Sequence, residues 1–253
     1  MMARGRRALF CCCFGLLLLD PIVMPDTRTH AARLGITAKA LSQAVASGRA
    51  ERIAHGAYRL AGVPATERDH VTAIWKLTAS AKFTHERMAA WDGIVIGGTS
   101  AANILGIGDF RLSPYRIYAR NRINSRIADA SFAVRAVDEE DIAWVDSLPI
   151  TKAERTLVDL CLDFEDPSLI GDALRDAARK RLDYDRLALL TSQESGKGAA
   201  GQLLGQLGEA AARIKGEEND VREATESGRA LFNVVPNGEA AERRWTHDGL
   251  DWE

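Results

Sequence analysis

The sequence predicts an α+β protein with an N-terminal winged helix-turn-helix, a mixed α/β domain and a helical, acidic C-terminal tail. Three observations indicate this class. Residues 28–60 combine two short helical patterns, a glycine turn and a tight hairpin pattern. Two β-rich segments follow in the middle of the chain, and amphipathic helical patterns dominate after it. With 253 residues and 46% hydrophobic residues, the chain can build one large or two modest cores without disulfide or metal support.

Changes in composition divide the chain into four parts. We assign them to a leader, a winged helix-turn-helix, a mixed domain, and a Gly/Ala-rich helix followed by an acidic, flexible tail, with the boundaries 1–24, 25–63, 66–194 and 195–253.

The leader has the basic and apolar parts of a signal peptide, in the form of Arg4, Arg6 and Arg7 followed by the apolar residues 8–19. The apolar run is too short to span a bilayer, and no small-x-small cleavage site follows it. Met24 stands directly before the first domain, so we favour an upstream start codon assigned in error over a membrane-targeting segment. We therefore expect a cytoplasmic protein without a membrane partner.

The winged helix-turn-helix is expected to begin with a short helix, in which Ala31 permits a close helix contact and Gly35 makes the turn. The second helix presents Leu41, Ala44 and Val45 at helical spacing as its inward stripe.

Capping residues mark the ends of this second helix, because Thr37 is placed to cap its start and Gly48 to end it. The face opposite the apolar stripe carries small and polar side chains that can reach base edges in a major groove. These are Lys39, Ser42, Gln43 and Ala46.

A β-hairpin follows the second helix, with strands expected at Arg49 to Ile53 and Ala57 to Leu60. They are joined through His55 and Gly56, where glycine supplies the positive φ of a tight turn. This hairpin would form the wing.

The charge of this segment indicates nucleic acid as its partner. Its six basic residues face only Asp26 and Glu51, in a chain whose net charge is −2. We expect double-stranded DNA to be bound by Thr37, Lys39, Ser42 and Gln43 from the second helix, and by Arg49, Arg52, His55 and Arg59 along the phosphates. The alternative is a small helical unit that makes only protein contacts.

The mixed domain follows a polar linker, GVPATERD, and is expected to open with a helix that runs to about Trp91. GIVIGG indicates a buried strand, followed by a short helix capped by Thr99 or Ser100. Tyr115 to Ala119 and Phe132 to Val137 alternate as two strands.

Helices are expected again from Ser147 onward. Thr151 and Glu154 match a capping box, and further helices are expected at Pro167 to Lys180 and Asp183 to Leu190. Arg155 and Asp159 lie four residues apart, at the spacing of an intrahelical ion pair.

A second basic stretch crosses the two predicted strands and contains Asp129 as its single acid. Three roles are open for this stretch: it extends the DNA footprint, it contacts an acidic partner, or it is a solvated strand face. Its members are Arg111, Arg116, Arg120, Arg122, Arg126 and Arg135.

An enzyme interpretation rests on Gly97 to Ser100, because nucleotidyltransferases place a Gly-Gly-Ser/Thr loop before two metal-binding carboxylates. Only Asp109 follows here, and the chain lacks a P-loop, a nucleophile elbow and zinc-ligand spacing, so we expect no enzyme, metal or cofactor. Three of the four cysteines are consecutive in the leader, and Cys161 lies in an apolar run that indicates a core position.

The chain resembles the AbiEi-type antitoxins and their transcriptional-regulator relatives in three segments, GITAKALSQAVASGRAERIAHGAYRL, GGTSAANILGIGDF and LPITKAERTLVDLC. The resemblance covers about Asp26 to Leu190, and the third segment, with T-x-x-x-R-T-L-V-D-L, is the most specific. It implies a bacterial DNA-binding protein of a type IV toxin-antitoxin system. Such a protein represses its own operon and, in many members, neutralises a nucleotidyltransferase toxin. An antitoxin that binds only its toxin remains the alternative.

Overall fold

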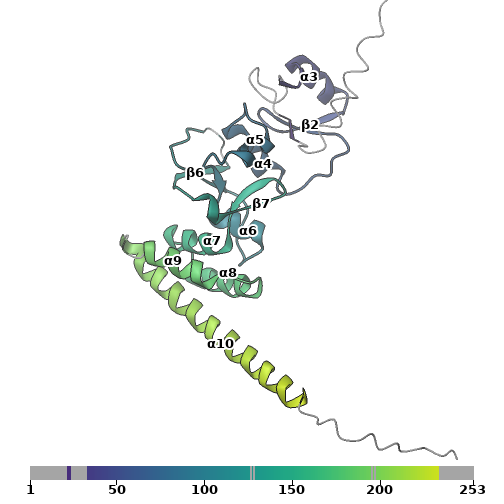
Figure 1. Cartoon of the computed structure of the whole chain (residues 1–253). Helices are drawn as coiled ribbons and strands as arrows, with labels where there is room; N and C mark the ends of the chain where they lie inside the picture. The colour runs from purple at the N-terminus through teal and green to yellow at the C-terminus, as the bar shows by residue number, and fades with distance from the viewer. Residues whose placement is uncertain are drawn as a thin grey trace, which may run out of the picture. The chain divides into compact units, whose positions relative to one another are not determined.

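The structure is a computed structural model that describes residues 22–23, 33–125, 127, 129–194, 196 and 198–233 (Figure 1). The chain divides into two units, Met1–Ala212 and Arg213–Glu253. The first unit contains two sheets and most of the helices, which confirms the predicted α+β class. No helix in the described part of the chain is long and apolar enough to cross a bilayer.

The N-terminal sheet has three strands, β1 (Ile22–Val23), β2 (Ala50–Ala54) and β3 (Ala57–Leu60), in the order β1-β3-β2. All neighbours are antiparallel. Helix α3 (Ala38–Ala46) precedes the β2–β3 hairpin and packs on β2. The hairpin confirms the predicted wing, whereas nearly all of the predicted first helix, including Ala31, lies outside the described residues.

The leader contributes to this sheet, which changes the predicted boundary. Ile22 lies opposite Arg59 and Val23 opposite Tyr58. The backbone of these two residues therefore adds a third strand to the wing, although we had assigned them to a segment before the domain. The other leader residues lie outside the described part of the chain.

Two helices, α4 (Asp69–Thr78) and α5 (Thr84–Ala89), replace the single helix predicted up to Trp91. The first ends because Ala79 leaves the helical region, and the chain then turns through a Lys82 N–H to Ala79 carbonyl bond of 2.9 Å. The Glu86 carboxylate accepts the Phe83 N–H at 2.7 Å, which starts the second helix.

The central sheet has five strands in the order β6-β5-β4-β8-β7. Two of its pairs are parallel, β4 with β8 and β5 with β6, and the other two are antiparallel. The strands are β4 (Val95–Ile96), β5 (Tyr115–Ala119), β6 (Ala130–Val134), β7 (Ile142–Val145) and β8 (Leu148–Thr151). The predicted strand at Tyr115 to Ala119 is confirmed, and its neighbour lies slightly earlier than Phe132 to Val137.

A hydrophobic core joins the central sheet to two helices. Val71, Ile74 and Trp75 of α4 pack with Ile104 of α6 (Gly98–Leu105) against Ile96 and other strand residues. On the sheet, these are Ile117, Leu148 and Ile150. Because these side chains are almost fully buried, the sheet and its two helices form one packing unit.

The prediction of a helix from Ser147 is wrong, because β7 and β8 form a hairpin there with Asp146 and Ser147 at positive φ. Helix α7 (Ala153–Leu162) begins later, and its N-cap Lys152 makes no side-chain cap bond. The Thr151 hydroxyl instead lies 2.7 Å from that of Thr156.

The capping predictions for Glu154, Thr99 and Ser100 are also wrong. The Glu154 carboxylate accepts the Asp183 N–H at 2.8 Å rather than closing a box at its own helix start. Gly97 is the N-cap of α6, and the Ser100 hydroxyl donates to the Leu112 carbonyl at 2.7 Å.

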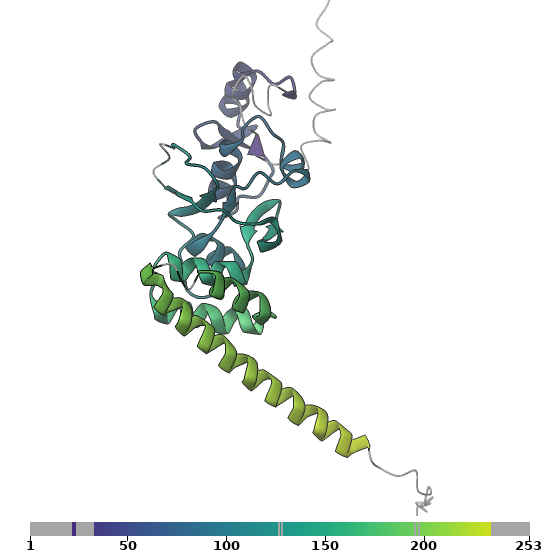
Figure 2. The same ribbon diagram turned by 60° about the vertical axis from the view of Figure 1, so that its left-hand side comes forward.

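The remaining helices are α7, α8 (Pro167–Arg179) and α9 (Tyr184–Glu194), which lie together beside the sheet in both views (Figure 1 and Figure 2). A last helix, α10 (Gly201–Asn233), begins in the first unit and continues into the second. The acidic residues 217–226 were predicted as a tail but belong to this helix, and the predicted tail after 233 lies outside the described residues.

Candidate nucleic-acid interface

Helix α3 begins and ends as its sequence predicts. Thr37 has extended backbone angles, and its hydroxyl accepts the Ala40 N–H at 3.2 Å. Gly48, at a φ of +69°, follows the last turn and donates its N–H to the Val45 carbonyl at 3.0 Å. Both ends of the helix are therefore set by the residues that the sequence indicates.

The inward face of α3 is narrower than predicted. Leu41 and Ala44 are buried, and Leu41 packs with Ile36 and Tyr58. Val45 is 37% exposed, so its assignment to the inward stripe is wrong. Helix α3 contacts strand β2, and Tyr58, the partner of Leu41, belongs to β3, so the buried face of the helix meets the wing sheet.

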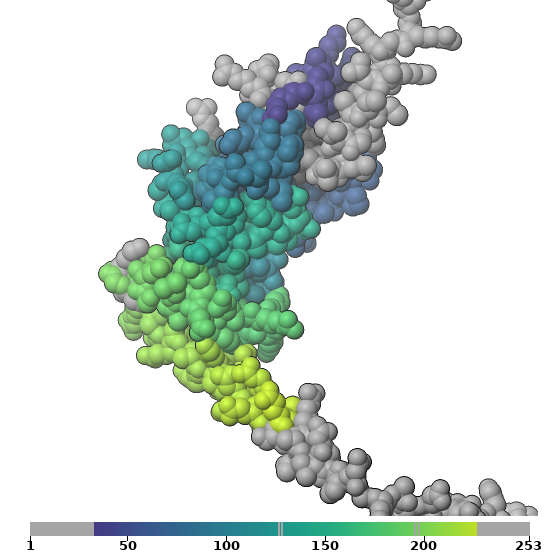
Figure 3. Space-filling model, in the orientation of Figure 1, coloured from purple at the N-terminus to yellow at the C-terminus, as the bar shows by residue number. Residues whose placement is uncertain are grey.

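The outward face of α3 is exposed along its whole length, and α3 lies at the surface in Figure 3. The four residues predicted there, Lys39, Ser42, Gln43 and Ala46, are all exposed. Lysine and glutamine donate hydrogen bonds to base edges, and serine and glutamine both donate and accept, so this face has the groups that read a major groove.

The wing presents three further exposed polar residues. Arg49 donates from Nε to the Ser47 hydroxyl at 2.9 Å, and an Arg52 guanidinium nitrogen lies 2.6 Å from Nδ1 of His55. Gly56, at a φ of +85°, closes the turn beside His55. Two exposed guanidinium groups therefore follow α3, that of Arg49 at the helix C-cap Ser47 and that of Arg52 at the hairpin turn.

Arg59 does not belong to this exposed set, contrary to the prediction. Its guanidinium pairs with the carboxylates of Glu51 and Asp69, and its side chain is only 11% exposed. Two acidic partners already neutralise it, so it is unsuited to phosphate contact. Its position instead connects β3 to the first residue of α4.

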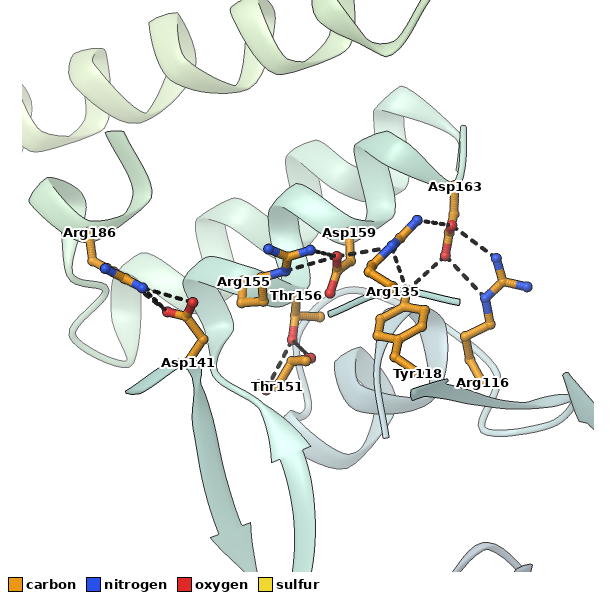
Figure 4. A network of polar contacts seen from close by, with 10 residues as sticks. All are labelled: Arg116, Tyr118, Arg135, Asp141, Thr151, Arg155, Thr156, Asp159, Asp163 and Arg186. Atoms are coloured by element: carbon orange, nitrogen blue, oxygen red, sulfur yellow. Dashed lines mark hydrogen bonds and ion pairs between the residues drawn. The ribbon is translucent and has the colours of Figure 1, made fainter. Parts of the chain in front are cut away.

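The second basic stretch separates into internal and surface arginines. Arg116 lies 2.9 Å from Asp163, and Arg135 lies 2.9 Å from Asp159 and 2.8 Å from Asp163, so these two belong to an internal ion network (Figure 4). Arg120 is exposed and 3.9 Å from Asp138. Arg111 and Arg122 are exposed, and Arg126 lies outside the described residues. The prediction of a basic surface is therefore wrong for Arg116 and Arg135.

The internal network fastens β5 and β6 to α7. Tyr118 donates its hydroxyl to Asp163 at 2.9 Å, and the Arg135 guanidinium lies 4.5 Å from the Tyr118 ring centroid. Arg155 donates from Nε to Asp159 at 3.0 Å, which confirms the predicted intrahelical ion pair. Burial raises the pKa of Asp159 to about 6, against the opposing effect of its two arginines.

The Gly97-Gly98 pair has a packing explanation. A Cβ atom at Gly97 would lie 1.9 Å from the Tyr118 ring, and one at Gly98, whose φ is +53°, would lie 2.9 Å from the Tyr118 hydroxyl. Asp109 is exposed, and no group of three or more metal-binding side chains occurs in the described part of the chain. The glycines therefore make room for an aromatic ring, which gives the pair a structural role.

One connection was not predicted from the sequence. Arg33 makes two hydrogen bonds to the Glu86 carboxylate, at 2.6 and 2.7 Å, and its guanidinium lies 4.1 Å from the Phe83 ring centroid. The hydrogen bond from Arg33 lowers the pKa of Glu86 to about 2. These residues are 53 positions apart, so no local pattern could indicate that the residues before α3 are tied to α5.

Comparison with known proteins agrees with this architecture. Residues 27–61 match the model of a family described as transcriptional regulator, AbiEi antitoxin, which confirms the resemblance seen in the sequence. The fold is similar to the crystal structure of the RV2827C protein from Mycobacterium tuberculosis, with a TM-score of 0.52 and 17% identity over 85% of this chain and 82% of that chain. No curated protein matches the sequence.

Proposed function

We propose that this chain is a sequence-specific DNA-binding regulator of the AbiEi-antitoxin type, which represses its own promoter. The observation that carries the proposal is the exposed polar face of α3 beside the basic turn of the wing. The family match at residues 27–61 supports it, because the match contains α3 and both strands of the β2–β3 hairpin.

The proposed contacts divide into two kinds. Lys39, Ser42 and Gln43 reach base edges from the exposed face of α3, and Thr37 stands at the helix start, where an N–H group can meet a phosphate. Arg49, Arg52 and His55 contact the backbone from the wing. Base contacts would supply sequence choice, and the wing would supply salt-sensitive affinity.

The antitoxin part of the proposal assigns the mixed domain to a toxin partner. The motif GGTSAANILGIGDF contains α6, and LPITKAERTLVDLC contains β8 and most of α7. Helix α6 contacts both of these elements. Under this proposal the domain neutralises a nucleotidyltransferase-type toxin encoded beside it, and DNA binding by the wing is separable from neutralisation.

Fluorescence anisotropy tests the DNA-binding proposal. The full chain is titrated onto labelled DNA from its own upstream region and onto a scrambled probe of the same composition, across a salt series. We expect tighter binding to the upstream probe and a steep loss of affinity with salt. Equal or absent binding to both probes would favour the protein-interaction alternative.

A double substitution, Lys39→Ala with Gln43→Ala, identifies the surface. Each lost base contact is expected to weaken specific binding by about 1–3 kcal/mol. Lys82→Ala with Gln193→Ala removes the same residue types from exposed positions outside the winged module and should leave binding unchanged. If both double variants bind the upstream probe like the wild type, α3 is not the recognition helix.

A further inference from the structure

One edge of the central sheet ends in a strand with a free side. Strand β6 comes first in the order β6-β5-β4-β8-β7, so β5 lies on one side of it and no described strand lies on the other. Figure 1 shows β6 at the outside of this sheet. A strand in this position presents backbone N–H and C=O groups with which another strand can pair.

Two hydrogen bonds fix the direction of the backbone groups at the ends of β6. The Tyr115 N–H donates to the Asp129 carbonyl at 2.7 Å, and the Arg135 N–H donates to the Ala119 carbonyl at 2.9 Å. Both bonds run to β5. In a parallel pair, alternate residues of one strand bond to the same neighbour, so the residues between these two ends can be assigned.

This alternation gives β6 an outer set of backbone groups. Ser131 and Ala133 have the same parity as the two bonded ends and face β5. The backbone groups of Ala130, Phe132 and Val134 therefore point to the free edge of the sheet.

The free edge lacks the features that usually prevent strand pairing. Strand β6 has the sequence ASFAV, with no charged residue, no proline and no irregularity in its register with β5. Val134 is 64% exposed. The strand at the opposite edge, β7, is instead flanked by Asp141 and Asp146. A neutral, regular edge with an exposed valine favours pairing with another strand.

We infer that β6 pairs with β6 of a second copy of this chain, antiparallel and centred on Phe132, and that the two central sheets join into one. A two-fold dimer uses the same surface on both copies, so the strand must complement itself. The sequence and hydrogen-bond directions of β6 satisfy this condition.

The register centred on Phe132 uses every outer residue of the strand. Phe132 lies opposite Phe132 of the partner subunit, and Val134 lies opposite Ala130 of the partner subunit. The N–H groups of Phe132 and Val134 then meet carbonyls across the interface. Ala130 contributes its carbonyl alone, because its N–H donates to the Ile127 carbonyl at 3.3 Å.

The same register places no like charges opposite each other. Asp129 precedes the strand and Arg135 follows it, so the antiparallel arrangement sets each one across from the other in the second copy. Opposite charges in such positions favour pairing. A shift of the strands by two residues would remove this match and leave outer backbone groups of β6 without a partner in the strand.

The interface is small, so the free dimer should be weak. Stable interfaces bury about 800 Å² on each partner, and an edge of five residues provides less. We expect a dissociation constant of about 1–100 µM without DNA. Two copies on one DNA molecule should associate more tightly, since dimers of helix-turn-helix proteins bind two half-sites, and this part rests on the proposed function.

Sedimentation equilibrium on the full chain without DNA tests the dimer. Samples from about 1 to 500 µM span the expected dissociation constant. We expect the mean mass to rise with concentration from one chain to two. A monomer at every concentration, or growth beyond two chains, overturns the inference.

Two substitutions at one position locate the interface. Val134→Pro removes an outward N–H without removing a bond to β5, and Val134→Lys places a charge on the edge. Both should raise the dissociation constant of the dimer by about tenfold or more. Val221→Lys changes an equally exposed valine of α10 and should have no effect. Wild-type dimerisation of both Val134 variants, or loss of the dimer in Val221→Lys, overturns the assignment to β6.

Cross-linking tests the register with the strand otherwise unchanged. Chains with Ala130→Cys and chains with Val134→Cys are mixed, in a background where the cysteines at 11–13 are serine. Opposite residues have Cα atoms about 5.5 Å apart, within reach of a disulfide, whereas two cysteines at the same position are about 13 Å apart or more along the strands. We expect disulfide-linked dimers in the mixture and not in either chain alone. Equal cross-linking in all three samples overturns the register.

A final measurement separates this inference from the proposed function. In the anisotropy titration on the upstream DNA, Val134→Pro should weaken binding by about fivefold or more, because it removes the contact between two bound copies. Wild-type DNA binding by this variant overturns the link to DNA alone. A chain that dimerises through β6 but binds no DNA supports the interface and overturns the proposed function.

Discussion

Arg59 of the wing and Asp69, the first residue of α4, form an ion pair that closes the linker between the two elements. Glu51 of β2 pairs with the same guanidinium, so one arginine joins both wing strands to the helix that follows. The Thr66 hydroxyl also donates to Asp69, at 2.6 Å, which fixes the linker itself. The wing is therefore braced against the core of the mixed domain.

Removing this brace should destabilise the protein. Asp69→Ala leaves a largely buried guanidinium with one acidic partner and takes an acceptor from Thr66, so we expect a loss of about 1–3 kcal/mol in the free energy of unfolding, measured in urea. Asp172→Ala breaks an exposed pair with Arg175 and should cost less than about 0.5 kcal/mol. Equal losses in the two variants would show that Asp69 has no special role.

The wing arginines should set the salt dependence of DNA binding. In Arg49→Ala with Arg52→Ala, we expect the slope of log K against log salt to fall by about 0.9 for each lost phosphate contact, while the preference for the upstream probe is retained. Arg175→Ala, an exposed arginine of α8, serves as the control in the same anisotropy series. An unchanged slope in the double variant would exclude phosphate contact by these two residues.

Asp159 should make stability depend on pH in an uncommon direction. Burial raises its pKa from 3.8 to about 6. At a pH between these two values, the folded chain therefore holds a proton on Asp159 that the unfolded chain has released. The contribution of this carboxyl to stability is greatest below about pH 4 and declines as the pH rises through about 6.

The substitution Asp159→Asn removes the titrating carboxyl group but keeps an oxygen that accepts hydrogen bonds from Arg135 and Arg155. The variant should therefore gain stability relative to the wild type as the pH rises from about 4 to about 7, by an amount on the order of 2–3 kcal/mol at 1.36 kcal/mol per pKa unit. Urea unfolding at several pH values measures the difference in the free energy of unfolding between the variant and the wild type. The contributions of the other titrating groups cancel in this difference. A difference that is constant with pH would contradict the raised pKa.

Cys161 should react with thiol reagents only when the chain unfolds. Its side chain is 0% exposed, and burial raises the pKa of its thiol to about 12, so almost no thiolate forms at neutral pH. In a background where Cys11, Cys12 and Cys13 are serine, labelling by iodoacetamide should follow the unfolding transition seen by circular dichroism. Rapid labelling under native conditions would mean that α7 opens locally.

Local patterns in the sequence were sufficient to predict the winged module. The Thr37 cap, the end of α3 at Gly48 and the hairpin turn at Gly56 all depend on neighbours within a few residues, and each is present in the structure. The exposed face of α3 followed from the same helical spacing. Its role in DNA binding remains a proposal.

Long-range pairing limited the prediction of the mixed domain. Arg116 and Arg135 read as a basic surface because their acidic partners, Asp159 and Asp163, are 24 to 47 positions away. Thr151 read as a helix cap, but the β7–β8 hairpin places it in a strand, where its hydroxyl meets Thr156. Sequence spacing cannot distinguish these outcomes, because the tertiary contact decides which role such a residue takes.

The contact between Gly97 and Tyr118 makes the two positions interdependent during evolution. Alanine at position 97 would place its methyl carbon inside the Tyr118 ring. The residue tolerated at position 97 therefore depends on the size of the residue at position 118. A relative with a larger residue at the first position must carry a smaller one at the second. The glycine pair before Thr99 and Ser100 is thus explained by the aromatic ring packed against it. Families that have this ring should keep the glycine pair, whatever reaction or partner they have acquired.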